Sequence, residues 1–177
     1  MKRSAALALA SLLLLSGCSS KNSQLPIRGE VVSCSSITQA GTKAGITLPC
    51  MDNKSKVQFG ALRGPIIVNV WGSWCAPCKE EIPFFRNFYA KNQIQILGVD
   101  VEEASPSDGI DFVLANGMTW PSVVDPDGRS RALFGMGVPV TWFIDENGKV
   151  LYKKIGVLKS EAEVRKLAQD NFHLVLN

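Results

Sequence analysis

Two cysteines separated by two residues, Cys75 and Cys78, are the side chains best suited to chemistry in this chain. A thiolate can attack a disulfide, and a second thiol three positions further along a helix lies on the same face and can displace the mixed disulfide. The same pair could instead close a structural disulfide or supply two ligands to a metal ion. Because the spacing alone leaves these alternatives open, we use the predicted strands and helices around the pair to distinguish between them.

The cysteine pair lies inside a predicted strand-helix-strand unit. Residues 65–71 are a nearly continuous run of apolar, β-branched side chains, which indicates a strand buried on both faces. Residues 76–92 carry apolar side chains at helical spacing, and residues 94–101 form a second buried strand. The pattern predicts two parallel strands joined by a right-handed helical crossover.

The cysteine motif falls where the first strand ends and the helix begins. Backbone N–H groups in the first turn of a helix lack intrahelical partners, so they and the helix dipole stabilise a thiolate there. We therefore expect Cys75 to be the nucleophile, with a lowered pKa, and Cys78 to resolve the mixed disulfide.

The rest of the chain continues the alternation of strands and helices. Predicted elements are a helix from Ser105 to Asn116, a strand at 122–125, a short helix through Leu133, a hairpin of 140–145 and 149–155, and a final helix after Ser160. Capping-box residues mark the helix starts, and an Asn-Gly turn marks the hairpin. With 177 residues, 46% apolar and 20% charged, the chain fits one globular α/β domain.

Two sequence blocks carry a resemblance to a known family. Residues 68–83, VNVWGSWCAPCKEEIP, resemble the active-site segment of the thioredoxin superfamily, and more narrowly that of the extracytoplasmic TlpA/ResA-like thiol-disulfide oxidoreductases. Residues 137–145, followed by Asn147-Gly148, are similar to the cis-proline loop and hairpin of that family. The resemblance covers about residues 57–172.

The resemblance implies a thioredoxin-like α/β fold with an N-terminal β-rich extension and an inserted helix and strand in the middle. It also implies exchange of disulfides with protein thiols, without a cofactor and without a metal. The residues between Cys75 and Cys78 do not set the direction of exchange, although the resemblance mildly favours a reductase.

The resemblance also assigns roles by position. Pro139 would be the cis-proline facing the disulfide, and Val138 would offer backbone groups to an extended peptide; the alternative is a trans-proline in a surface turn. Glu81 matches the acidic position of the family and would accept the Cys78 proton or tune the cysteine pKa values, unless it is an ordinary solvated glutamate. Trp71 and Trp74 would form walls of the site, with core packing as the alternative.

The N-terminus has the form of a bacterial lipoprotein signal. Two basic residues precede an apolar run of eleven residues, too short for the roughly 20 that a membrane-spanning helix needs. The run ends in Leu-Ser-Gly-Cys18, which resembles a lipobox. This implies a signal over 1–17, a lipid on Cys18 that anchors the protein outside the cytoplasm, a flexible tether over 18–28 and one domain over 29–177. The alternative is an ordinary cleaved signal with a chance cysteine.

The remaining cysteines are Cys34 and Cys50. If Cys18 is acylated, four cysteines allow three pairings, and local closure of Cys75 with Cys78 favours a Cys34–Cys50 disulfide. A structural bridge is consistent with export. The alternative is that one of these cysteines is a second redox thiol.

Other functions fit the sequence less well. A copper chaperone on the same fold, the main alternative, would want three residues between its cysteines and a distal histidine, whereas the one histidine, His173, lies near the C-terminus. Zinc is a poorer fit, because only one cysteine pair has the spacing of a zinc knuckle. A peroxidase would need a threonine where Gly72 stands, and the cysteine motif could also be an inert disulfide in a binding module.

The partners expected are protein thiols or disulfides outside the cytoplasm, together with a membrane redox partner. Nucleic acid is not expected, because the net charge of +3 is spread without a basic stripe.

Overall fold

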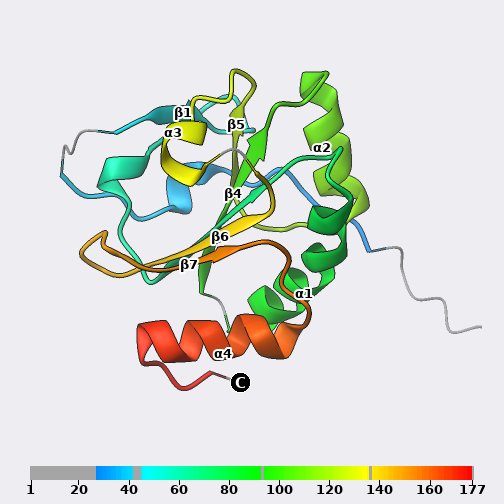
Figure 1. The fold of residues 1–177 in the computed structure, drawn as a ribbon. Helices are drawn as coiled ribbons and strands as arrows, with labels where there is room; N and C mark the ends of the chain where they lie inside the picture. The colour runs from blue at the N-terminus through cyan, green and yellow to red at the C-terminus, as the bar shows by residue number, and fades with distance from the viewer. Residues whose placement is uncertain (1–26, 42–44, 93, 136, 177) are drawn as a thin grey trace, which may run out of the picture.

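The computed structural model describes residues 27–41, 45–92, 94–135 and 137–176 (Figure 1). The predicted signal segment, Cys18 and most of the predicted tether lie outside the described residues. The elements are two short 3-10 helices η1 (Cys34–Ser36) and η2 (Phe59–Ala61), the strands β1 (Thr47–Pro49), β2 (Lys56–Gln58), β3 (Ile66–Trp71), β4 (Gln95–Val101), β5 (Ser122–Asp125), β6 (Val140–Ile144) and β7 (Val150–Ile155), and the helices α1 (Ala76–Asn92), α2 (Pro106–Ala115), α3 (Arg131–Phe134) and α4 (Glu161–Phe172). Among these helices none is long and apolar enough to cross a bilayer.

A five-stranded mixed sheet forms the centre of the molecule, in the order β5-β4-β3-β6-β7. The β3-β4 and β4-β5 pairs are parallel, whereas β6 runs antiparallel to both β3 and β7. The two parallel pairs are joined through α1 and α2, as the alternating apolar runs predict. This is the thioredoxin-like arrangement, so the predicted fold class is confirmed.

Two apolar cores lie on opposite faces of the sheet. The first lies under α1, α2 and α4 and includes Phe85, Phe112 and Val164. The second lies under the N-terminal extension and α3 and includes Leu48 and Phe134. All six residues of β3 are buried, because β3 is the central strand and is covered on both faces.

The helix ends and the hairpin follow the local signals in the sequence. Ser105 accepts a hydrogen bond from the backbone of the first turn of α2, and Asp108 closes the capping box. Ser160 caps α4 through the Glu163 amide. In the β6-β7 turn Gly148 has a φ of 79°, a left-handed conformation that glycine adopts without strain.

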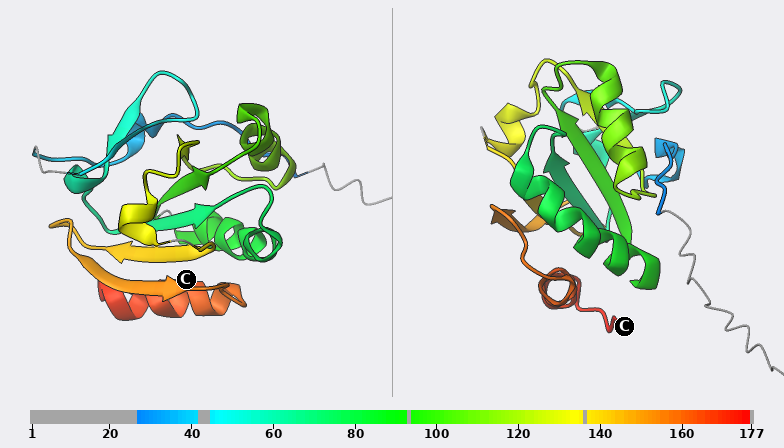
Figure 2. Two further views of the ribbon diagram at one scale, coloured as in Figure 1. Left: turned by 45° about the horizontal axis from the view of Figure 1, so that its top comes forward. Right: turned by 90° about the vertical axis from the view of Figure 1, so that its right-hand side faces the viewer.

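The N-terminal extension has less strand than the predicted β-rich segment. Its β1 and β2 are three residues each, and the rest is irregular or 3-10 helical. Backbone hydrogen bonds from Gly29 to Leu114 and from Glu30 to Met118 tie its start to the end of α2. Figures 1 and 2 show that the extension and α4 lie at opposite ends of the molecule, with the central sheet between them.

Candidate active site

The sheet register brings the two sequence blocks together. Because β6 is antiparallel to β3, with Val70 paired to Val140, the residue before β6 lies beside the end of β3 that leads to the cysteines. That residue is Pro139, and the Val138–Pro139 peptide bond is cis. The amide of Gly156 donates to the Pro139 carbonyl at 3.0 Å, which fastens the proline loop to the chain after β7.

The cysteine motif begins α1 as a closed disulfide. Cys75 and Cys78 are bonded, with their Cα atoms 5.3 Å apart, and their exposed fractions are 4% and 0%. The Cys78 amide donates to Cys75 Sγ at 3.1 Å. Once the disulfide is reduced, the same amide and the helix N-terminus favour the thiolate form of Cys75 over the thiol.

Trp74 and Trp71 have different surroundings, although both flank the motif. The Trp74 side chain is 56% exposed and its indole Nε1 donates to the Val101 carbonyl at 3.1 Å. The indole covers Gly72, where an added Cβ would lie 2.6 Å from Trp74 Nε1, so a threonine at this position does not fit. Trp71 is fully buried and stacks on Phe112, so Trp71 belongs to the core and only Trp74 faces the site.

Glu81 lies one turn after Cys78 and is fully buried, unlike a solvated helix glutamate. Its Oε1 accepts from Asn69 Nδ2 at 2.7 Å and its Oε2 accepts from the Leu158 amide at 3.0 Å. Burial raises the pKa of Glu81 to about 7, although these two hydrogen bonds act in the opposite direction. A carboxyl group that titrates near neutral pH can both take up and release a proton.

The partners of Glu81 were not among the predicted site residues. Asn69 in β3 also contacts Thr141 in β6, at 3.3 Å between Nδ2 and Oγ1. Asn69 is the one polar residue in an otherwise apolar strand sequence, which is the signal that could have identified it. The side-chain amide group of Asn69 is buried and therefore needs hydrogen-bond partners. By donating to Glu81, it helps to hold the Glu81 carboxyl group in place.

A carboxylate that was not among the predicted site residues, Glu103, holds the loop before Cys75. Glu103 accepts from both the amide and the hydroxyl group of Ser73, each at 2.5 Å. Charge-assisted hydrogen bonds of this kind are stronger than neutral ones, so Glu103 fixes the loop that carries Trp74 and Cys75.

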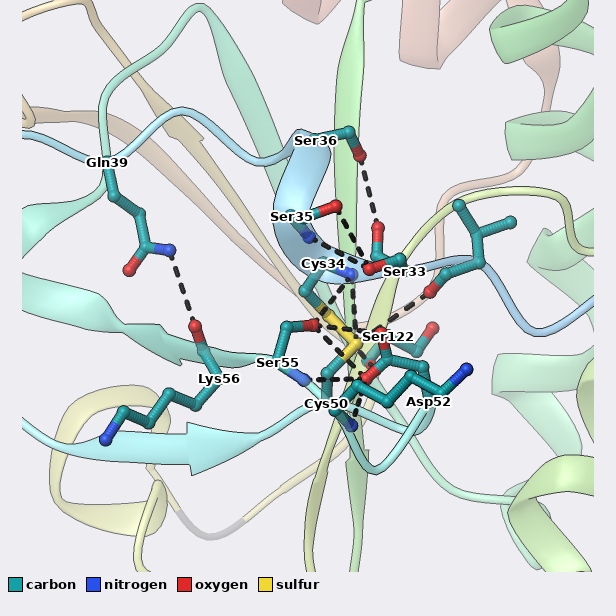
Figure 3. Close-up of a disulfide and its surroundings, with 12 residues drawn as sticks. Ser33, Cys34, Ser35, Ser36, Gln39, Cys50, Asp52, Ser55, Lys56 and Ser122 are labelled. Atoms are coloured by element: carbon teal, nitrogen blue, oxygen red, sulfur yellow. Dashed lines mark hydrogen bonds between the residues drawn. A yellow bond between two sulfur atoms is a disulfide. The ribbon is translucent and has the colours of Figure 1, made fainter.

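Cys34 and Cys50 form the second disulfide, with Cα atoms 5.9 Å apart and both residues fully buried (Figure 3). Serine and aspartate side chains surround this bridge. Ser55 Oγ accepts from the Cys34 amide, and Asp52 accepts from the amide and hydroxyl groups of Ser55. The cysteines of this bridge belong to the N-terminal extension and not to the start of α1 beside the cis-proline loop, which fits the structural interpretation better than a second redox thiol does.

The comparisons with known proteins agree with this geometry. A family model described as "AhpC/TSA family" matches residues 41–153. The chain belongs to the AhpC/TSA family. The match includes the cysteine motif, Glu81, the cis-proline loop and Cys50, so the family segment contains nearly all of the site.

Within the AhpC/TSA family, the chain is similar to two curated proteins named thiol-disulfide oxidoreductase ResA. It is 30% identical to the Bacillus thuringiensis protein over 106 residues, which are 57% of this chain and 61% of that protein. It is 38% identical to the Geobacillus thermodenitrificans protein over 95 residues, 51% of this chain and 52% of that one. The chain thus spans between half and three fifths of these relatives.

A solved structure is similar over a larger part of its length. The structure is described as a putative thiol:disulfide interchange protein DsbE from Chlorobium tepidum. It is 26% identical and has a TM-score of 0.60, and the match covers 75% of this chain and 96% of the other.

Proposed function

We propose that this chain is a thiol-disulfide oxidoreductase that exchanges disulfides with protein thiols through Cys75 and Cys78, working as a reductase. The observation that carries the proposal is the cysteine pair at the N-terminus of α1 together with the cis-proline loop beside it. The names of the relatives support the same activity.

In the proposed reaction the reduced Cys75 thiolate attacks a substrate disulfide. One substrate sulfur leaves as a thiolate and takes up a proton, while a mixed disulfide joins Cys75 to the other. Cys78 then loses its proton and attacks Cys75 Sγ, which releases the second substrate thiol. The substrate disulfide gains two electrons and two protons, and the Cys75–Cys78 disulfide is the oxidised product.

Glu81 is proposed to take the proton from Cys78 in the second step. Its buried carboxyl group and its pKa of about 7 suit a base that works near neutral pH. Asn69 and the Leu158 amide hold both carboxyl oxygens, so they are positioning groups for this step.

Substrate binding is proposed to use the exposed face of Trp74 and the backbone groups of Val138, with Pro139 facing the disulfide. A partly buried loop beside a sheet can accept an extended peptide through main-chain hydrogen bonds. We further propose that a lipid on Cys18 anchors the protein outside the cytoplasm and that a membrane redox partner restores the Cys75 and Cys78 thiols.

The test is to trap the mixed disulfide. Replacing Cys78 by serine removes the resolving thiol, so a reducible adduct between Cys75 and substrate proteins should accumulate. The matched control, in which both Cys75 and Cys78 are serine, should form none. If Cys78→Ser forms no adduct and reduces insulin at the wild-type rate, the proposed mechanism is wrong.

A measured reduction potential separates reductase from inert disulfide. A Cys75–Cys78 potential below about −300 mV would indicate a structural bond that resists exchange. A potential between that value and that of strong oxidants, together with turnover of insulin by an added thiol reductant, supports the reductase.

A further inference from the structure

A cavity of about 260 Å³ opens next to the loop that Glu103 holds. It lies between the ends of β4 and β5, the start of α2 and the N-terminal extension. Its apolar lining residues include Met51, Ile110 and Val124. The lining also includes four carboxyl groups, of which Asp100 near the end of β4 and Asp125 at the end of β5 are 3% and 0% exposed.

Most of the carboxylates at the cavity already have partners. Glu102 is ion-paired with Arg131, and Asp125 accepts from two backbone amides of the turn that follows it. Glu103 accepts from the amide and hydroxyl groups of Ser73.

Asp100 lies close enough to Glu103 for a side-chain hydrogen bond, but one of its two carboxyl oxygens has no partner among the described residues. Its Oδ1 is buried and receives no hydrogen bond from any of the residues that the structure describes. A buried polar oxygen without a donor is costly, on the order of 1–3 kcal/mol, so an occupant that supplies a donor is favoured.

The charge around Asp100 also favours a cation. Burial raises the pKa of Asp100 to about 9, and the side-chain hydrogen bond with Glu103 and the negative charges of Glu103 and of Asp108 on α2 add to this effect. Asp100 therefore holds a proton at neutral pH, at a place where a positive charge would be favourable. A cation bound between Asp100 and Glu103 would replace that proton and restore the ionised carboxylate.

We propose that this cavity is a substrate subsite that binds a lysine or arginine side chain near the reacting cysteine of the substrate protein. The proposal rests on the proposed function, because it assigns part of the substrate to that active site.

The lining and the volume of the cavity match this kind of side chain. Lysine and arginine carry a long apolar stem and a charged end, and they can bury the stem along an apolar wall while the charge reaches polar partners. The volume is below the roughly 300 Å³ at which small-molecule sites begin, which fits one side chain better than a cofactor. Within the described residues no group of three or more histidine, cysteine, aspartate or glutamate side chains is placed to hold a metal ion.

The cavity is also close enough to the cysteines to select substrates. Glu103 is hydrogen-bonded to Ser73, which precedes Cys75 by two residues. Two residues of extended chain span at most about 7 Å. A basic residue bound here would therefore lie within about four positions of the substrate cysteine in an extended peptide.

The test uses short peptides with one central cysteine, each oxidised to a symmetrical disulfide dimer, and measures the second-order rate at which they oxidise the reduced protein. A glutamine at one position, two to four residues from the cysteine, is replaced in turn by lysine, arginine or glutamate. At the best position we expect the lysine and arginine peptides to react about tenfold faster than the glutamine peptide, the size of one charged hydrogen bond. The glutamate peptide should react more slowly.

Two variants locate the effect. Glu103→Gln keeps an acceptor for the Ser73 amide, and Asp100→Asn keeps the shape of the buried group. The readout in each variant is the ratio of the lysine-peptide rate to the glutamine-peptide rate, which should fall from about ten to about one whatever change the variant makes in the rate of the glutamine peptide itself. The matched control is Glu80→Gln, which removes an exposed carboxylate next to the cysteine motif but outside the cavity, and should keep the preference. If circular dichroism shows that Asp100→Asn does not fold, Glu103→Gln decides alone.

The outcomes separate the subsite from the activity. Equal rates for the lysine and glutamine peptides at every position, or a preference that survives in the folded variants, would overturn the subsite and leave the oxidoreductase intact. The subsite is also overturned if Glu80→Gln abolishes the preference as well, because the effect then comes from general surface charge. A wild-type protein that reacts with none of the peptides would contradict the proposed function itself.

Discussion

The two disulfides of this protein have similar Cα separations but different surroundings. The Cα separations are 5.9 Å for Cys34–Cys50 and 5.3 Å for Cys75–Cys78, and all four residues are nearly or fully buried. The first bridge spans 16 residues within an irregular extension, whereas the second spans three residues at a helix N-terminus. Burial and covalent geometry therefore do not identify the working pair. The position at the N-terminus of α1, the cis-proline loop and the buried glutamate do, whereas an amide-to-sulfur hydrogen bond of 3.1 Å occurs at both bridges.

Removing the nucleophile should have the largest effect. Cys75→Ser leaves no thiolate at the helix N-terminus, so we expect insulin reduction to fall by more than about a thousandfold. The measurement is the rate of insulin precipitation with an excess of thiol reductant. A rate within the wild-type range would mean that Cys78 or another thiol starts the reaction.

Removing the other bridge should leave the rate unchanged and lower the stability. Closing a loop of 16 residues restricts the unfolded chain by about 3 kcal/mol, so Cys34→Ala combined with Cys50→Ala should lower the free energy of unfolding by about that amount. Urea titration of the folded variant gives the value. A parallel loss of insulin reduction would show that the two bridges do not have separate roles.

Glu81, which lies beside the working pair, should make the free energy of unfolding fall as the pH rises. Its pKa is raised from 4.5 to about 7, so the folded protein keeps the proton to a higher pH than the unfolded chain does. This contribution is fully present below pH 4.5 and is lost as the pH approaches 7, at a slope of up to about 1.4 kcal/mol per pH unit. In the oxidised protein, Glu81→Gln should make the free energy of unfolding, measured by urea titration, depend less on pH across that window. The exposed control Glu80→Gln should leave this pH dependence unchanged.

Asp52, which lies near the Cys34–Cys50 disulfide, should have a smaller effect of opposite sign. Its contribution to the free energy of unfolding should be lost as the pH falls. Hydrogen bonds from the Lys54 and Ser55 amides lower the pKa of Asp52 below its ordinary 3.8, so its contribution is present above pH 3.8 and lost as the pH falls. Asp52→Ala should lower the free energy of unfolding by about 1 kcal/mol at neutral pH. Glu146→Ala, in an exposed turn, is the control, and an equal loss in both variants would argue against the Asp52 turn.

The parts of this structure that local sequence could predict are those set by local rules. A β-branched run followed by a helix start predicts β3 and α1, and the capping box at Ser105 predicts where α2 begins. The cis-proline and the acidic position came from the family resemblance, because neither residue type by itself shows what lies opposite it.

Contacts between side chains on neighbouring strands could not be predicted from the sequence. Thr141 approaches Asn69 only because β6 pairs with β3 in one register, and Glu103 reaches Ser73 because β4 ends beside β3. The charge of Asp100 is equally a property of the assembled site, since an aspartate next to a strand is ordinarily ionised. Burial and neighbours, which the fold supplies, change its chemistry.

Cys50 also forms an isolated antiparallel backbone β-bridge with Val123 of β5, and this pairing affects how copies of this protein meet. An exposed strand edge is a template for pairing with another chain, and the described sheet has two edges, β5 and β7. The extension covers the β5 edge through the Cys50–Val123 bridge and the Met51–Ser122 hydrogen bond, whereas β7 carries two lysines that discourage pairing. A chain without the extension should therefore self-associate through β5, even with its redox cysteines intact.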